Sequence, residues 1–318
     1  MTEELKKKLH NIGIVPVVKL DDANKAVGLA KALLDGGINC AEVTFRTAAA
    51  EESIKNIVKV YPEMFVGAGT VTNVELAKKA VNAGAKFIVS PGFNEDTVGW
   101  CVANDIPIIP GVCTPSDIEK GLARGFDVLK FFPAEASGGI NMLKNFAGPF
   151  PNLMFMPTGG INLANLQDYA KTKNVLATGG SWMVKADLIE NEKWDTITDM
   201  CKAAMLELQG FEFAHIGIED DKDSEKTISA LQLFGLDLKR GSSSSFVSNY
   251  IEVVPSLISA KKGHIGFKCN DIERAIEYLK DKGFTPKESS FKYNDNNQLK
   301  VCYFNEEVSG FALHLVRK

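Results

Sequence analysis

The sequence predicts an α/β chain in two domains, a (β/α)8 TIM barrel over residues 1–208 and a smaller α+β domain over residues 211–318. Three observations predict it. Short apolar segments alternate with amphipathic helical segments up to about residue 208, as they do in parallel βα units. Polar and charged residues stand at the carboxyl ends of those apolar segments, where the active sites of barrel proteins lie. After Gly210 the pattern changes to shorter strands that follow two similar openings.

Eight apolar segments are expected to form the barrel strands, and helical segments such as residues 22–34 and 73–82 follow them. The strands are expected at residues 13–20, 40–46, 65–71, 87–91, 106–112, 128–134, 153–158 and 175–179. A doubly wound sheet is the competing architecture. Its dinucleotide-binding version needs glycines in the first strand-to-helix turn, which here reads Lys19-Leu20-Asp21-Asp22.

Composition narrows the class of protein. The chain is 45% hydrophobic and 24% charged, with a net charge of −4, which argues against a nucleic-acid or membrane-surface partner. The charged residues 1–10 do not resemble a secretory signal, and no run approaches the ~20 apolar residues of a membrane span, so we expect a cytoplasmic protein. The six cysteines are scattered without a CxxC pair, which favours free thiols.

Lys130 is the candidate centre of the chemistry, because it lies in the apolar run Val128-Leu129-Lys130-Phe131-Phe132-Pro133-Ala134. An ammonium group is costly to bury, so a lysine in such a setting tends to lose its proton and can then attack a ketone to form a Schiff base. The alternative is a lysine whose stem covers apolar surface while its head reaches water. Glu42 and Arg46, charged residues in another apolar strand, favour the reactive lysine, because such charges need partners or a function.

Two glycine-bearing turns follow the last two expected strands: Gly159-Gly160 opens a helix, and Gly180-Ser181 follows the eighth strand. Backbone N–H groups of such turns can bind an anion, and the loops after strands seven and eight are the usual phosphate site of barrels. Tight turns without a ligand are the alternative.

Seven motifs in residues 1–208 together resemble the family of class I aldolases that act on 2-keto-3-deoxy-6-phosphogluconate (KDPG) and 4-hydroxy-2-oxoglutarate (KHG). They are Glu42-Val43-Thr44-Phe45-Arg46-Thr47, Gly67-Ala68-Gly69-Thr70-Val71, Ser90-Pro91-Gly92, Ile109-Pro110-Gly111, Lys130-Phe131-Phe132-Pro133-Ala134-Glu135, Pro157-Thr158-Gly159-Gly160-Ile161 and Gly179-Gly180-Ser181-Trp182. The resemblance implies a homotrimer and an aldehyde-lyase that needs no cofactor besides its Schiff-base lysine.

By that resemblance Lys130 forms the Schiff base, Glu42 is the general acid and base, and Arg46 binds the carboxylate of the keto acid. The remaining residues carried over line the pocket or receive the distal anion: Thr70, Pro91, Thr158, Gly159, Gly160, Gly180 and Ser181. Both a phosphorylated sugar acid and hydroxyoxoglutarate fit such a pocket, so the choice of substrate stays open.

Residues 211–318 resemble the vicinal oxygen chelate superfamily, which includes glyoxalase I and related resistance proteins. The segment His215-Ile216-Gly217 recurs as His264-Ile265-Gly266, and each is expected to open a βαββ-type module. The resemblance implies a divalent metal on the first and last strand of each module, at His215, Glu252, His264 and His314; these ligands suit zinc, nickel, iron or manganese. Residues 242–245 are expected to form a flexible loop in a first module that has lost a strand.

Three functions follow from these patterns. The leading one is a retro-aldol lyase that releases pyruvate from a 2-keto-4-hydroxy acid. The second is a metabolite-sensing regulator that keeps the barrel as a scaffold and uses the second domain to sense an α-hydroxy or keto compound. The alternative to a metal site in that domain is a degenerate module that serves oligomer contacts or ligand sensing, with its histidines only packed along strands. The third is a bifunctional enzyme whose second domain carries a metal-dependent isomerase or lyase.

Overall fold

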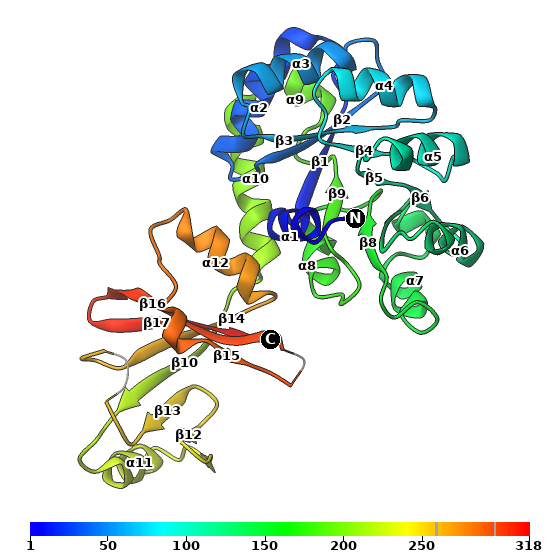
Figure 1. The fold of residues 1–318 in the computed structure, drawn as a ribbon. Coiled ribbons are helices and arrows are strands. Elements are labelled where there is room, and N and C mark those ends of the chain that lie inside the picture. Colours follow the sequence, from blue (N-terminus) through cyan, green and yellow to red (C-terminus); the bar gives the residue numbers. More distant parts are fainter. Residues whose placement is uncertain (258–259, 296) are drawn as a thin grey trace. The chain divides into compact units, whose positions relative to one another are not determined.

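The computed structural model describes residues 1–257, 260–295 and 297–318 and divides them into two compact units, Met1–Leu208 and Gln209–Lys318 (Figure 1). Within the described residues no helix combines the length and apolar character needed to cross a bilayer. All six cysteines are free thiols, as the spacing predicts.

Unit 1 is a TIM-like α/β fold of parallel strands, which confirms the predicted class. Its strands are β1 (Ile14–Val18), β2 (Cys40–Thr44), β3 (Phe65–Gly69), β4 (Phe87–Val89), β5 (Ile108–Ile109), β6 (Gly111–Val112), β7 (Val128–Phe131), β8 (Met154–Pro157) and β9 (Thr178–Gly180). Parallel pairing runs from β1 through β5, resumes from β6 to β8, and β9 pairs back onto β1. A bridge between Thr158 and Gly179 links the end of β8 to β9.

The fifth and eighth strands differ from the expected bounds. The segment expected at 106–112 is split at Pro110, which has no N–H to donate, although its carbonyl accepts from Lys130 N at 2.9 Å. Val175 makes only an isolated bridge to Phe155, and regular pairing starts at Thr178.

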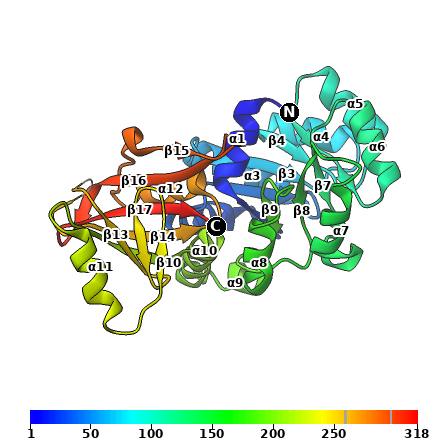
Figure 2. The same cartoon turned by 90° about the horizontal axis from the view of Figure 1, so that it is seen from below.

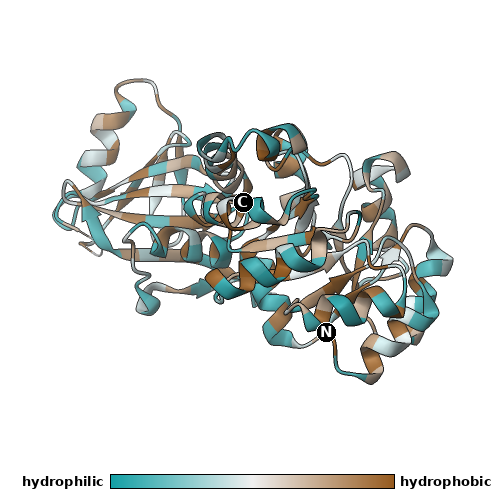
Figure 3. Cartoon of the chain, turned by 90° about the horizontal axis from the view of Figure 1, so that it is seen from above, coloured by the Kyte–Doolittle hydropathy of each residue, from teal (hydrophilic) through white to brown (hydrophobic). Residues whose placement is uncertain are grey.

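The helices of unit 1 lie around the strands (Figures 1 and 2). They are α1 (Glu3–Ile12), η1 (Ala23–Lys25), α2 (Ala26–Asp35), α3 (Ala50–Val60), α4 (Val74–Asn82), α5 (Glu95–Ala103), α6 (Pro115–Ala123), η2 (Glu135–Ser137), α7 (Gly139–Phe146), α8 (Leu163–Ala170), α9 (Ala186–Glu190) and α10 (Trp194–Gln209). Each of these helices carries both hydrophobic and hydrophilic residues (Figure 3). In α3, for example, Ala50, Ile54 and Ile57 are buried while Glu52, Lys55 and Lys59 are exposed, which is the spacing of an amphipathic helix.

Unit 2 holds an eight-stranded sheet in the order β11-β12-β13-β10-β14-β17-β16-β15. The first module contains β10 (Glu212–Glu219), α11 (Ser224–Gln232), β11 (Leu238–Arg240), β12 (Ser245–Val247) and β13 (Ile251–Val254). The second contains β14 (His264–Cys269), α12 (Ile272–Lys280), η3 (Glu288–Ser290), β15 (Lys292–Tyr293), β16 (Leu299–Val308) and β17 (Phe311–Arg317). The two modules repeat one topology, and their first strands, β10 and β14, pair antiparallel at the centre of the sheet.

Two expectations about unit 2 are wrong. Each module has three strands after its helix, so its pattern is βαβββ rather than βαββ. The first module has lost no strand, because Gly241 N donates to Ser244 O and the serine-rich segment is the turn of the hairpin between β11 and β12. A run of serines next to one short strand looks like a linker in sequence, because strands of three residues leave almost no period-two pattern to detect.

Candidate active site

Lys130 and Glu42 form a buried ion pair inside the barrel. Lys130 Nζ lies 3.3 Å from Glu42 Oε1, and the two side chains are 6% and 1% exposed. The register of the parallel strands positions both residues. Lys130 on β7 pairs with Gly111 on β6 and with Met156 on β8, and Glu42 on β2 pairs with Gly67 on β3. Within the described part of the chain, Glu42 Oε2 is buried and has no hydrogen-bond partner, so this oxygen can serve a substrate group or a water.

Two neighbours shape this pair. A Cβ on Gly69 would lie 2.1 Å from Glu42 Oε1, so the carboxylate occupies space that any side chain on β3 would fill. The ring of Phe132 lies 5.2 Å from Lys130 Nζ, within cation–π range. Phe132 was not among the expected site residues, although its place two residues beyond Lys130 is the signal that could have found it.

Arg46 and Thr70 meet just beyond the carboxyl ends of β2 and β3. Arg46 Nε donates to Thr70 Oγ1 at 3.2 Å, and Arg46 is exposed. Thr70 has a φ of +56°, a left-handed conformation that is costly for a β-branched residue and that tends to occur at functional sites. The strained backbone therefore holds the hydroxyl where it orients the guanidinium.

Thr158 and Pro91 follow β8 and β4. Thr158 is buried, and a Cβ on Gly179 would lie 2.3 Å from its hydroxyl oxygen, so the glycine makes room for that side chain. Pro91 is half-buried, and a Cβ on Gly111 would lie 2.2 Å from its carbonyl oxygen. In both cases a glycine on a later strand, on β9 for Thr158 and on β6 for Pro91, allows the close approach.

The two glycine turns also lie at the ends of β8 and β9. Gly159 and Gly160 have φ values of +102° and +83°, which favour glycine, and Gly160 leaves space for the side chain of Glu135. Gly180 is buried against the Trp182 ring, whereas Ser181 is exposed.

In unit 2 the structure brings the four expected metal ligands together. His314 Nε2 lies 3.1 Å from His215 Nε2, and Glu252 Oε2 lies 3.2 Å from His215 Nε2 and 3.1 Å from His264 Nε2. Donor atoms of the three histidines all lie within 4.8 Å of one another, and all three residues are buried. We call His215, His264, His314 and Glu252 the histidine cluster.

The repeated His-Ile-Gly segment explains how three imidazoles fit on one sheet. In the antiparallel pair of β10 and β14, His215 faces Gly266 and Gly217 faces His264. A Cβ on Gly217 would lie 1.9 Å from the His264 ring, and one on Gly266 would lie 2.5 Å from His314 Nε2. The Cβ on Gly266 would also lie 2.8 Å from His215 Cε1, so Gly217 gives space to an imidazole of the other module and Gly266 gives space to one imidazole of each module.

Three polar residues that the sequence did not reveal surround the cluster. Glu219 Oε1 lies 3.3 Å from His264 Nδ1, Ser244 Oγ donates to Glu252 Oε1, and the Tyr303 ring stacks on His314 with centroids 4.5 Å apart. Glu219 could have been found from the sequence, because side chains two and four residues apart on a strand share one face, and His215, Gly217 and Glu219 have this spacing. Neither Ser244 nor Tyr303 carries such a signal.

The pKa values of His314, Glu252 and the neighbouring Tyr303 are shifted from their usual ranges. Burial lowers the pKa of His314 to about 3, helped by the neighbouring imidazoles. Burial alone would raise the pKa of Glu252, but hydrogen bonds from His215, His264 and Ser244 outweigh it and hold that pKa well below its usual range. Burial, with Glu252 and Glu219 nearby, raises the pKa of Tyr303, which stays neutral.

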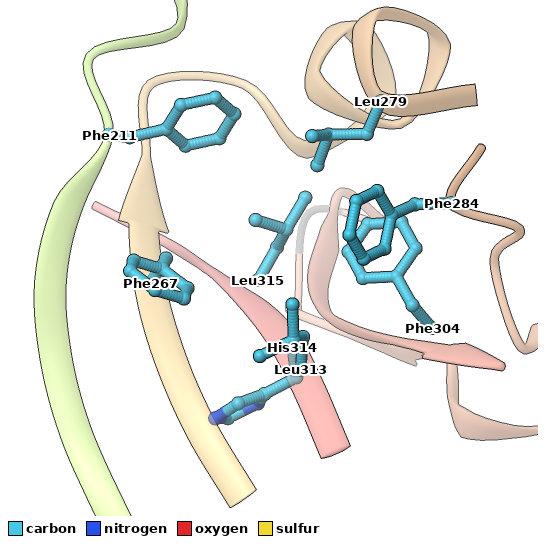
Figure 4. Close-up of a pocket in the computed structure, with 8 residues that line it drawn as sticks. All are labelled: Phe211, Phe267, Leu279, Phe284, Phe304, Leu313, His314 and Leu315. Atoms are coloured by element: carbon cyan, nitrogen blue, oxygen red, sulfur yellow. The ribbon is translucent and has the colours of Figure 1, made fainter. Parts of the chain in front are cut away.

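An apolar pocket of about 200 Å³ lies between α12 and the sheet of unit 2 (Figure 4). It is lined by Phe211, Phe267, Leu279, Phe284, Phe304, Leu313, His314 and Leu315. Several of these residues also pack against the hydrophobic core of the second module.

Comparison with known proteins bears on unit 1. The family model described as "KDPG and KHG aldolase" matches residues 5–200. The 2-dehydro-3-deoxy-phosphogluconate aldolase of Treponema pallidum is 45% identical over 62% of this chain and 94% of its own length. The KHG/KDPG aldolase of Escherichia coli is 44% identical over 60% of this chain and 90% of its own length. A KDPG aldolase structure from Legionella pneumophila, with pyruvate captured as a covalent carbinolamine intermediate, is 39% identical with a TM-score of 0.61 over 63% of this chain and 97% of its own.

These matches cover unit 1, the unit that holds the buried pair of Lys130 and Glu42. The chain belongs to the KDPG and KHG aldolase family, and the activity of unit 1 is that of an aldolase, a carbon–carbon lyase.

Proposed function

We propose that unit 1 cleaves 2-keto-3-deoxy-6-phosphogluconate to pyruvate and glyceraldehyde 3-phosphate through a Schiff base on Lys130, and that it also cleaves 4-hydroxy-2-oxoglutarate to pyruvate and glyoxylate. The buried pair of Lys130 and Glu42 carries this proposal. Aldolases of Treponema pallidum and Escherichia coli named for these substrates support it.

The chemistry follows from the pair. Glu42 takes a proton from the Lys130 ammonium, and the resulting amine attacks the C2 ketone. Glu42 then returns the proton to the carbinolamine hydroxyl, which leaves as water, and the iminium cation that forms accepts the electrons of the breaking C3–C4 bond. Glu42 takes the proton of the C4 hydroxyl as the aldehyde leaves. The enamine is then protonated at C3 and hydrolysed to pyruvate. The buried and unpartnered Glu42 Oε2 supports the role of Glu42 in these proton transfers.

The other residues hold the substrate. Arg46, oriented by Thr70, binds the carboxylate of the keto acid, because a guanidinium matches a carboxylate with two parallel hydrogen bonds. Pro91 and Thr158 line the pocket. Backbone N–H groups at Gly159, Gly160, Gly180 and Ser181 receive the phosphate or the second carboxylate.

Borohydride reduction in the presence of pyruvate tests the mechanism. We expect one reduced adduct, on Lys130, and none in Lys130→Ala, which keeps its fold but loses cleavage. Lys59→Ala removes an exposed lysine of α3 and is expected to behave as wild type. An adduct on another lysine would overturn the assignment.

We also propose a homotrimer, which the family resemblance implies. Light scattering is expected to give three times the 34.6 kDa mass of the chain, and a monomer would contradict this.

For unit 2 we propose a vicinal oxygen chelate domain that binds one divalent metal ion at the histidine cluster. The repeated βαβββ topology supports the class. The donor set supports the ion, because around a metal with ligand distances of about 2.1 Å neighbouring donors lie about 3.0–3.4 Å apart, and the contacts here are 3.1–3.2 Å. When bound, such an ion polarises a carbonyl or lowers the pKa of a bound water.

Elemental analysis of tag-free protein tests this site. We expect about one equivalent of zinc, nickel, iron or manganese per chain, lost in His215→Ala and retained in His10→Ala, the histidine of unit 1. A metal content well below one equivalent per chain that is the same in wild type and in His215→Ala would contradict the proposal.

Full-length variants separate a bifunctional enzyme from a regulator. If unit 2 has its own metal-dependent activity on an aldehyde or keto acid, Lys130→Ala retains it and His215→Ala loses it. If unit 2 senses a metabolite, His215→Ala instead changes how aldol cleavage responds to that compound.

A further inference from the structure

Glu219 is a second buried carboxylate at the histidine cluster, and we propose that it is the positioning residue of His264 in the metal site. The inference rests on the metal site proposed above. On β10, Glu219 stands two residues beyond Gly217 and four beyond His215, on the same face of the sheet. Its Oε1 lies 3.3 Å from His264 Nδ1, and both side chains are 1% exposed.

This contact occupies one of the two ring nitrogens of His264. Glu219 Oε1 lies beside Nδ1, while the other ring nitrogen, Nε2, lies 3.1 Å from Glu252 Oε2 within the histidine cluster. A histidine that binds a metal through one ring nitrogen usually donates the N–H of the other to a carboxylate, which fixes the orientation and the tautomer of the ring. Glu219 stands where it can accept that hydrogen bond and hold Nε2 toward the ion.

We infer that Glu219 contributes to the affinity of the site for its ion without touching the ion, because its buried contact is with the ring nitrogen of His264 that faces away from Glu252.

Cobalt titration of the full-length, tag-free apoprotein tests the inference, with the visible cobalt spectrum as the readout. We expect Glu219→Gln to bind Co²⁺ ~10–100-fold more weakly than wild type, with a changed spectrum, because removing such a partner typically costs that much affinity. Glu212→Gln, on the same strand but exposed, is the matched control and is expected to bind as wild type. Thermal unfolding and aldol cleavage report whether each variant is folded.

The outcomes separate the two proposals. A wild type that binds no cobalt overturns the metal site and this inference with it. A wild type that binds cobalt while Glu219→Gln binds equally well overturns only the role of Glu219. If Glu219→Gln fails to fold, ring-nitrogen NMR of the zinc-loaded wild type decides: a His264 with the proton on Nε2 contradicts the inference.

Discussion

Replacing Gly69 with alanine should displace the carboxylate of Glu42 without touching Lys130. The new Cβ would lie 2.1 Å from Glu42 Oε1, 2.6 Å from its Cγ and 2.7 Å from its Cδ, whereas ordinary contact begins at 3.4 Å. The carboxylate must therefore move by about 1.3 Å, the difference between 2.1 and 3.4 Å. A misplacement of about 1 Å can cost ~100-fold in rate, or about 2.7 kcal/mol in the activation barrier.

Steady-state cleavage of 2-keto-3-deoxy-6-phosphogluconate, coupled to pyruvate detection, measures this effect. We expect kcat/KM of Gly69→Ala to fall ~100-fold, while circular dichroism shows a folded barrel at the assay temperature. Gly99→Ala on α5, where the nearest atom lies 4.0 Å from the new Cβ, is the control and is expected to retain full activity. A folded Gly69→Ala enzyme with activity close to wild type would refute the reasoning that the position of this carboxylate limits cleavage.

Three further changes are expected to have distinct effects. Arg46→Lys keeps the charge but loses the paired hydrogen bonds, so KM for both substrates should rise ~10-fold or more; an unchanged KM would argue against carboxylate binding there. Ser181→Ala should lower kcat/KM more for the phosphorylated substrate than for hydroxyoxoglutarate, and an equal loss on both would count against a phosphate contact. Gly266→Ala would place a Cβ 2.5 Å from an imidazole nitrogen of the cluster; metal analysis should show loss of the ion at unchanged aldolase activity, and retention of a full equivalent would contradict the proposed site.

The strand pattern and the residues at strand ends were accessible from the sequence because both depend on local rules. Alternation of apolar strands and amphipathic helices predicts parallel βα units, and such units bring the carboxyl ends of their strands to one mouth. The proposed site residues Glu42, Arg46 and Lys130 could be selected on that ground alone. The repeated His-Ile-Gly segment likewise placed His215 and His264 on the strands that open the two modules, and the superfamily resemblance placed His314 on the last strand of the second module.

Contacts between distant positions were decided by the tertiary structure. Lys130 and Glu42 are 88 residues apart, and their 3.3 Å contact depends on strand register and on the space that Gly69 leaves. The left-handed backbone of Thr70 is likewise held against its local preference by the surrounding fold.

In unit 2, too, the sequence determined the residue types on the strands, and the tertiary structure decided the contacts between them. The sequence determined which residue types stand on the strands, because alternation has a fixed period of two. Only the pairing of β10 with β14 decided that Gly217 faces His264, and only the packed sheet brought Glu219 to His264 Nδ1 and Glu252 to two imidazoles. The physical reason is that a hydrogen bond or a metal ligand set depends on ångström-scale distances between strands, and these distances follow from register and side-chain clearance rather than from the order of residues along one strand.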